Sequence, residues 1–191
     1  NSSDTTSIPK ELADSIDVDT FSYSLDASNY IIDSTGQKFY GQIKNSTKIA
    51  AARHIYFKNE EKEERLYYPT EIIEWKKDGK INRSKPFQVN KDKIIAAFME
   101  LLSPDTGVVK VYEFHNSFIG AFPITLVLLE KDSVLTEVKA GKFKKQMQAY
   151  FADQPEIVAY LEDKKLKKKD LVDIVAQYNE LVEVAKAALL Q

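Results

Sequence analysis

Residues 139–191 read KAGKFKKQMQAYFADQPEIVAYLEDKKLKKKDLVDIVAQYNELVEVAKAALLQ, and this stretch decides the fold. It predicts two or three helices that follow a β-rich body. In the first helix, apolar residues recur at i, i+4, i+7 and i+8, which places them on one helix face. They are Phe143, Met147, Tyr150 and Phe151. Such a face needs a partner surface, so we expect it to pack on the rest of the chain.

The next two helices have clear boundaries. Asp153 is followed three residues later by Glu156, with Pro155 between them, and this capping-box pattern predicts a helix that begins at Asp153. A Lys-rich connection at residues 164–169 then leads to a final helix, residues 171–191, that contains neither Gly nor Pro. We interpret the lysine run as a solvated connection, and contact with an anionic surface or an acidic partner is the alternative.

The same stretch carries a family resemblance. Its motifs are the Phe-rich first helix, the sequence Asp153-Gln154-Pro155-Glu156 and the Tyr178-Asn179 pair in the last helix. Together they resemble the C-terminal end of a family of uncharacterised cell-envelope proteins of Bacteroidetes bacteria, although that family often has Cys where this chain has Gln154. Upstream, residues 36–43 and 68–72 resemble the family's first strand and its Pro-Ser/Thr-Glu-Ile turn. The resemblance implies a fold type and a location in the cell envelope (periplasm or outer-membrane surface) or outside the cell. It implies no activity.

The first two thirds of the chain predict an antiparallel β body. Residues 38–43 alternate as one half-buried strand does, and Gly41 within them indicates a bulge or a close approach by another element. Asp78-Gly79 is the strongest hairpin signal, because it supplies the positive φ of a tight turn. Ile94 to Leu102 fits both helical and strand spacing, and we favour a strand because a turn and an apolar strand-like run follow it.

The sequence therefore predicts an α+β fold. An antiparallel sheet of about eight to ten short strands, curled into a half-barrel or sandwich, precedes two or three C-terminal helices. We expect residues 1–20 to form an acidic tether with a short helix, and residues 21–191 to form a single domain. In that domain, residues 21–138 make the β body and residues 139–191 the helical segment. The chain does not begin with Met, from which we expect a processed form whose removed segment carried a signal or a lipid anchor.

Composition argues against several classes of function. The 191 residues include no Cys, which rules out disulfides, Cys-ligated metals and thiol catalysis. The net charge of −2 gives no global field that would favour nucleic acid. No apolar run approaches the roughly 20 residues that a transmembrane helix needs. With six Gly and neither a P-loop nor GxGxxG, a phosphate-binding loop is not expected, and no cofactor is predicted.

The sharpest chemical constellation is Glu113-Phe114-His115. Residues i and i+2 of a strand point to the same side, so this carboxylate and imidazole can converge. If His54 lay on a neighbouring strand, two imidazoles and one carboxylate could hold a metal ion. A polar strand end without chemistry is the commoner meaning of such a pattern.

An aromatic group in the β body is the second candidate. Tyr56, Tyr67, Tyr68 and Trp75 would form a platform for sugars or peptides if they were exposed, although core packing is their commoner role. We therefore expect a non-enzymatic envelope or secreted binding module for a protein, peptide or glycan. The alternatives are a divergent enzyme with a metal-assisted site around Glu113 and His115, and a structural protein that dimerises through the C-terminal helix.

Overall fold

The computed structural model describes residues 29–44, 47–116, 122–163 and 165–190, and the expected tether at residues 1–20 lies outside them. The described residues form eleven strands and four α-helices. The strands are β1 (Tyr30–Asp33), β2 (Lys38–Tyr40), β3 (Gln42–Lys44), β4 (Ile55–Lys58), β5 (Glu64–Tyr67), β6 (Ile72–Lys77), β7 (Lys80–Asn90), β8 (Lys93–Leu101), β9 (Val109–Asn116), β10 (Ile124–Lys131) and β11 (Val134–Glu137). The helices are α1 (Lys48–Ala51), α2 (Phe143–Tyr150), α3 (Pro155–Asp163) and α4 (Leu171–Leu189).

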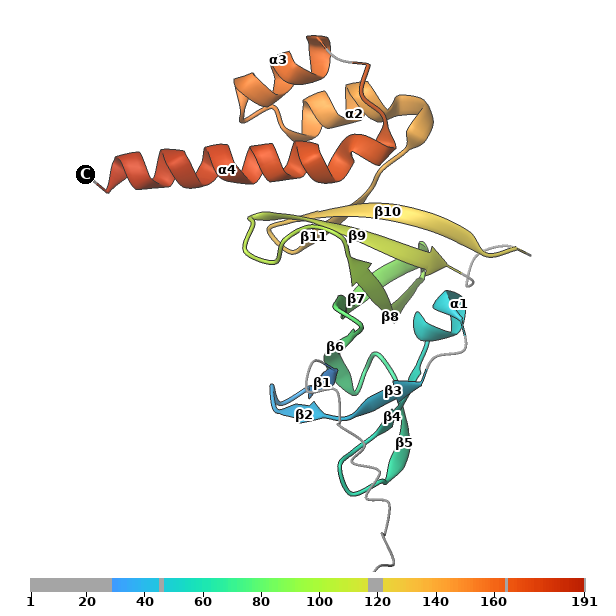
Figure 1. Ribbon diagram of the computed structural model, residues 1–191. Helices are drawn as coiled ribbons and strands as arrows, with labels where there is room; N and C mark the ends of the chain where they lie inside the picture. The colour runs from blue at the N-terminus through green and yellow to red at the C-terminus, as the bar shows by residue number, and fades with distance from the viewer. Residues whose placement is uncertain (1–28, 45–46, 117–121, 164, 191) are drawn as a thin grey trace, which may run out of the picture.

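The architecture is α+β, as the sequence predicts. Eight antiparallel strands form one sheet in the order β11-β10-β9-β8-β7-β6-β1-β2, and β3, β4 and β5 form a second, smaller sheet. The three C-terminal helices lie together at one end of the molecule, beside β9 and β10, and the small sheet lies at the other end (Figure 1). The predicted strand at Ile94 to Leu102 is confirmed as β8.

The tight turn predicted at Asp78-Gly79 forms, and the structure contains a second turn of this kind. Asp78 and Gly79, between β6 and β7, have φ values of 51° and 81°, which are the left-handed values of a two-residue hairpin turn. Asp132 and Ser133 have φ values of 53° and 64° and connect β10 to β11 in the same way. Because the Asp78-Gly79 turn is so short, it fixes which residues of β6 and β7 face each other.

The prediction of one strand at residues 38–43 is wrong. β2 ends at Tyr40 on the edge of the large sheet, and β3 begins at Gln42 in the small sheet. Gly41 is the point where the chain passes from one sheet to the other. A Cβ at this position would overlap the main-chain oxygen of Lys58 and lie 2.7 Å from the ring of Phe57. The close approach predicted for Gly41 is therefore confirmed, and it accompanies a change of sheet within the predicted strand.

The C-terminal helices share a hydrophobic core with the large sheet. Phe143, Met147 and Phe151 are buried, as their helical spacing predicts. The buried cluster comprises Val109, Val111, Leu129, Val138, Phe143, Met147, Phe151, Ile157, Leu161, Leu171, Ile174, Val175 and Tyr178. At its far end, α4 leaves Val184, Leu189 and Leu190 exposed, which is the surface that dimerisation through this helix would use. Within the described residues, no helix has the length and hydropathy needed to cross a bilayer.

The second C-terminal helix begins at Pro155 instead of the predicted Asp153. The main-chain oxygen of Gln154 accepts hydrogen bonds from the N–H groups of Ile157 and Val158, at 3.1 and 3.2 Å, and so closes the first turn. The side chain of Asp153 contacts Lys131 and Tyr178, which lie far from it in the sequence.

Asp153 and the Tyr178-Asn179 pair tie the helices to the sheet. The Oδ2 atom of Asp153 accepts hydrogen bonds from the Tyr178 hydroxyl and the Lys131 ammonium, each at 2.7 Å. The side-chain amide of Asn179 donates to the main-chain oxygen of Val109 and accepts from its N–H, each at 2.9 Å. These motif residues therefore have a structural role in docking α4.

The Asp153 contact predicts a measurable pH dependence of stability. Burial alone would raise the pKa of Asp153, but hydrogen bonds from Lys131 and Tyr178 outweigh it and lower the pKa. A lowered folded-state pKa stabilises the fold above the unfolded value of about 3.9, and this contribution is lost as the pH falls through the folded value. We expect Asp153→Asn to lower the free energy of unfolding at pH 7 by about 1 kcal/mol, the upper end for an exposed pair.

The measurement is urea unfolding of both proteins at several pH values. The difference between the wild-type protein and the variant should shrink steadily as the pH falls from 5 toward 2. A difference that stayed constant with pH would show that the carboxylate charge is not what stabilises this contact.

Candidate functional site

A gap between two neighbouring strands creates the candidate site. Strands β8 and β9 pair only at Glu100 with Glu113 and at Leu101 with Tyr112. Helix α1 lies against the diverging strands, and the N–H of Phe98 on β8 donates to the main-chain oxygen of Ala52 at 2.9 Å. The short helix is thereby fixed as one wall of a pocket.

Helix α1 was not predicted from the sequence. Its N-cap is Thr47, whose hydroxyl accepts a hydrogen bond from the N–H of Ala50 at 3.1 Å. The sequence offers one indication of this helix, a threonine N-cap before the residues Lys48–Ala51. Four residues are too few to show helical periodicity.

The pocket between α1 and strands β6 to β9, which we call the α1 pocket, has a volume of about 290 Å³. This is at the low end of the range for small-molecule sites. Its lining consists of Thr47, Lys48, Ala51, Ala52, Trp75, Lys77, Asp78, Lys80, Asn82, Phe98, Glu100, Glu113 and His115. Four of these residues, Trp75, Asn82, Glu100 and Glu113, face one another in a single row across β6, β7, β8 and β9.

The aromatic floor of the α1 pocket contains a buried unsatisfied polar group, with a second polar side chain beside it. Trp75 is only 4% exposed, and its ring meets that of Phe98 edge-on at 6.2 Å. Within the described part of the chain, the buried indole Nε1–H of Trp75 has no hydrogen-bond partner. Directly opposite it on β7, Asn82 is 9% exposed, and its side chain lines the same pocket. Leaving a buried donor unpaired costs about 1–3 kcal/mol, so the Trp75 indole marks a place where a ligand is expected.

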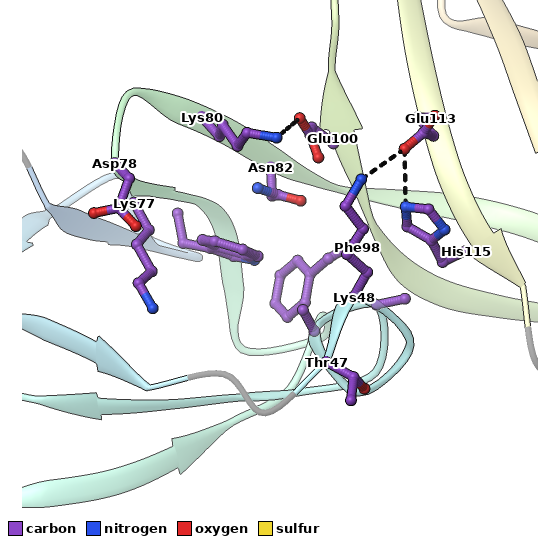
Figure 2. A pocket seen from close by; sticks show the side chains of 13 residues that line it. Thr47, Lys48, Lys77, Asp78, Lys80, Asn82, Phe98, Glu100, Glu113 and His115 are labelled. Atoms are coloured by element: carbon purple, nitrogen blue, oxygen red, sulfur yellow. Dashed lines mark hydrogen bonds and ion pairs between the residues drawn. The ribbon is translucent and has the colours of Figure 1, made fainter. Parts of the chain in front are cut away.

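The rim of the α1 pocket is charged with both signs. Lys80 Nζ lies 2.8 Å from Glu100 Oε1, and Lys48 Nζ lies 3.2 Å from Glu113 Oε1 (Figure 2). Because Glu100 and Glu113 face each other across β8 and β9, the two lysines offset a repulsion between like charges. The hydrogen bond to Glu100, followed by the charge of that carboxylate, raises the pKa of Lys80. Both lysine side chains are more than half exposed, so each pair contributes only about 0–1 kcal/mol and can open for a ligand.

The structure brings Glu113 and His115 together, as their i and i+2 spacing predicts. The Nε2 atom of His115 lies 2.9 Å from Glu113 Oε1, in a geometry that makes an ion pair with a protonated ring but no hydrogen bond. The Nδ1 atom lies 3.1 Å from the hydroxyl of Thr125, the residue opposite it on β10. The imidazole of His115 therefore lines the α1 pocket. Its contacts with Glu113 and Thr125 fix the orientation of the ring.

His54 lies apart from this pair. Its ring contacts those of Tyr56 and Tyr68 edge-on, with centroids at 5.9 and 6.3 Å, and it does not line the α1 pocket. Among the residues that the structure describes, no three His, Asp or Glu side chains are arranged to hold a metal ion.

The four predicted aromatic residues are divided between two places. Tyr56 and Tyr68 are 45% and 48% exposed and flank His54 at the small sheet. Tyr67 is half-buried, and its ring packs on Phe57 at 6.1 Å. Trp75 is buried in the floor of the α1 pocket, so it does not belong to the exposed group.

Comparisons with protein-family models, with curated proteins and with solved structures gave no match. The resemblance of the C-terminal motifs to the envelope family therefore stays a prediction. The candidate site rests on its own geometry.

Proposed function

We propose that the protein is a non-enzymatic binding module whose ligand occupies the α1 pocket. The observation that carries this proposal is the indole N–H of Trp75, which is buried in the pocket floor with no partner among the described residues. A ligand that supplies an acceptor removes the cost of this unpaired donor when it binds. The rings of Trp75 and Phe98 supply apolar contact area for the same ligand.

The pocket's chemistry supports a small polar ligand such as a peptide segment or part of a glycan. Its charged lining residues comprise three lysines and three carboxylates, so it favours neither strong anions nor strong cations as a whole. At its volume it encloses one or two residues of a peptide or one sugar substituent, and a large protein surface would contact only its rim. The envelope or extracellular location that we propose for this module is supported by the sequence resemblance alone.

Trp75 makes the proposal directly testable, because it is the only tryptophan of the chain. Its fluorescence therefore reports on the surroundings of the α1 pocket. We expect one member of a panel of short peptides and glycans to change the emission of Trp75 saturably. That ligand should also raise the melting temperature, because it binds the native state. The control is Tyr68→Ser, which alters the exposed aromatic group and should leave the response unchanged.

Two other outcomes would contradict the proposal. Binding that is lost in Tyr68→Ser but leaves Trp75 emission unchanged would place the ligand on the exposed aromatic group. A melting-temperature rise with divalent cations alone, reversed by a chelator and lost in His115→Ala, would favour the divergent enzyme. The contact between Glu113 and His115 is the observation that supports this second candidate.

A further inference from the structure

We infer that the α1 pocket recognises a secondary amide, the C=O and N–H of a peptide bond or of an N-acetyl group. This inference rests on the proposed function, because it specifies the ligand of the same pocket. It follows from the unpaired indole of Trp75, from the amide of Asn82 directly opposite it, and from the apolar surface beside them.

Trp75 and Asn82 lie next to each other on the pocket floor. They are directly opposite in the β6–β7 hairpin, a position in which Cβ atoms are about 4.5–5.5 Å apart. Both side chains are more than nine-tenths buried. Figure 2 shows Asn82 projecting from β7 into the space between Lys80 and Phe98. One ligand group can therefore reach both side chains.

The hydrogen-bonding capacities of the two side chains favour a ligand group that both accepts and donates. The indole of Trp75 only donates, whereas the amide of Asn82 both donates and accepts. A secondary amide satisfies both, because its carbonyl accepts from the indole and its N–H donates to the Asn82 oxygen. A carboxylate would leave the Asn82 oxygen without a donor, and an ammonium group would leave the indole without an acceptor.

Another asparagine of this chain shows how a side-chain amide binds main-chain amide groups. The side-chain amide of Asn179 forms two hydrogen bonds with the main-chain N–H and C=O of Val109, each at 2.9 Å. Asn82 carries the same donor and acceptor and lines the pocket beside Trp75. Ala51, Ala52 and Phe98 supply an apolar surface for a small group on the amide, such as a methyl.

The test compares ligand pairs that differ in the amide. N-acetylglucosamine and glucose share a ring and differ in the acetamido group, whereas trialanine and free alanine differ in the peptide bonds. We expect Trp75 emission to respond to N-acetylglucosamine, to trialanine or to both, at concentrations at least about 10-fold lower than to the matched amide-free compound. This is the effect expected for gaining one or two hydrogen bonds that leave no buried group unpaired. The arm that responds identifies the source of the amide.

A variant of Asn82 supplies the second measurement. Asn82→Leu loses the acceptor that the ligand N–H would use, so we expect amide ligands to bind about 10-fold more weakly to it. Gln88→Ala, on the same strand but outside the pocket, should bind as the wild-type protein does. Ligand comparisons on the wild-type protein stand even if an Asn82 variant fails to fold.

The outcomes separate this inference from the proposed function. Saturable binding of glucose or alanine as tight as that of the amide partner would overturn the inference and leave the binding module in place. Equal binding by the wild-type protein and a folded Asn82→Leu variant would do the same. If no compound in an extended panel perturbed Trp75, both proposals would fail together.

Discussion

Arg83→Met is expected to lower the free energy of unfolding by about 3–5 kcal/mol. The Arg83 guanidinium donates from Nε to Glu74 at 2.8 Å and from Nη1 and Nη2 to Asp105 at 2.6 and 2.5 Å. Glu74 is buried and also accepts from the Tyr30 hydroxyl at 2.7 Å. Removing the cation leaves a buried carboxylate without its charge partner, which is far more costly than losing an exposed pair.

The pKa shifts of Arg83 and Asp105 also indicate that this network stabilises the charged forms of both groups. Hydrogen bonds to Asp105 and then Glu74 raise the pKa of Arg83 against the effect of burial. The bonds from Arg83 lower the pKa of Asp105.

Denaturant unfolding of Arg83→Met beside Lys44→Met tests this expectation. Lys44 pairs with Glu64 at 2.7 Å on the exposed face of the small sheet, so its loss should cost at most about 1 kcal/mol. Adding Glu74→Gln to Arg83→Met should recover part of the lost stability, because it removes the uncompensated charge. Similar effects for the two single variants would contradict a buried network around Arg83.

The second large effect is expected for Phe151→Ala, at about 3–5 kcal/mol. Phe151 is fully buried between the helices and the sheet, with its ring centroid 5.0 Å from that of Tyr150 and 4.9 Å from that of Tyr178. Deleting the ring removes apolar contacts and leaves a cavity in the cluster that joins the helical segment to the β body.

This variant also tests the single-domain prediction for residues 21–191. Far-ultraviolet circular dichroism follows the helices, whereas Trp75 fluorescence follows the β body. We expect both transitions to coincide and to move together to lower denaturant concentration in Phe151→Ala. A fluorescence midpoint that stayed at the wild-type value while the dichroism midpoint fell would show that the helices unfold as a separate unit.

Local chemistry made part of the site predictable from the sequence. The Asp78-Gly79 turn is a two-residue hairpin, which sets Trp75 opposite Asn82 once the turn type is recognised. The period of a strand likewise places Glu113 and His115 on one side. Local patterns could not show that the Trp75–Asn82 pair and the Glu113–His115 pair line one pocket. That depends on the pairing of β8 with β9, which brings distant parts of the sequence together.

Long-range geometry made the rest unpredictable. The α1 pocket depends on the divergence of β8 from β9 and on the position of a four-residue helix in front of them. At Gly41 the sequence predicts a close approach but not the change of sheet. The residues that approach it, Phe57 and Lys58, lie on another strand, β4. The half-buried position of His54 between Tyr56 and Tyr68 depends on that same small sheet.

The C-terminal motifs illustrate a different limit. Asp153, Tyr178 and Asn179 are distinctive in sequence, yet each holds α4 or the helix connection against the sheet. A motif of this kind predicts how the chain folds and carries no information about a ligand. The candidate site lies farther along β9, in residues that the motifs do not include.

The indole N–H resonance of Trp75 gives the most direct test of the binding site. A ¹⁵N-labelled sample has one tryptophan indole signal, because the chain has one tryptophan. Titration with N-acetylglucosamine and with trialanine should move this signal saturably downfield for at least one of them, as the unpaired donor gains an acceptor, and should leave it in place with glucose and alanine. A ligand that bound and shifted other amide signals while the Trp75 indole signal stayed still would contradict the α1 pocket as the binding site.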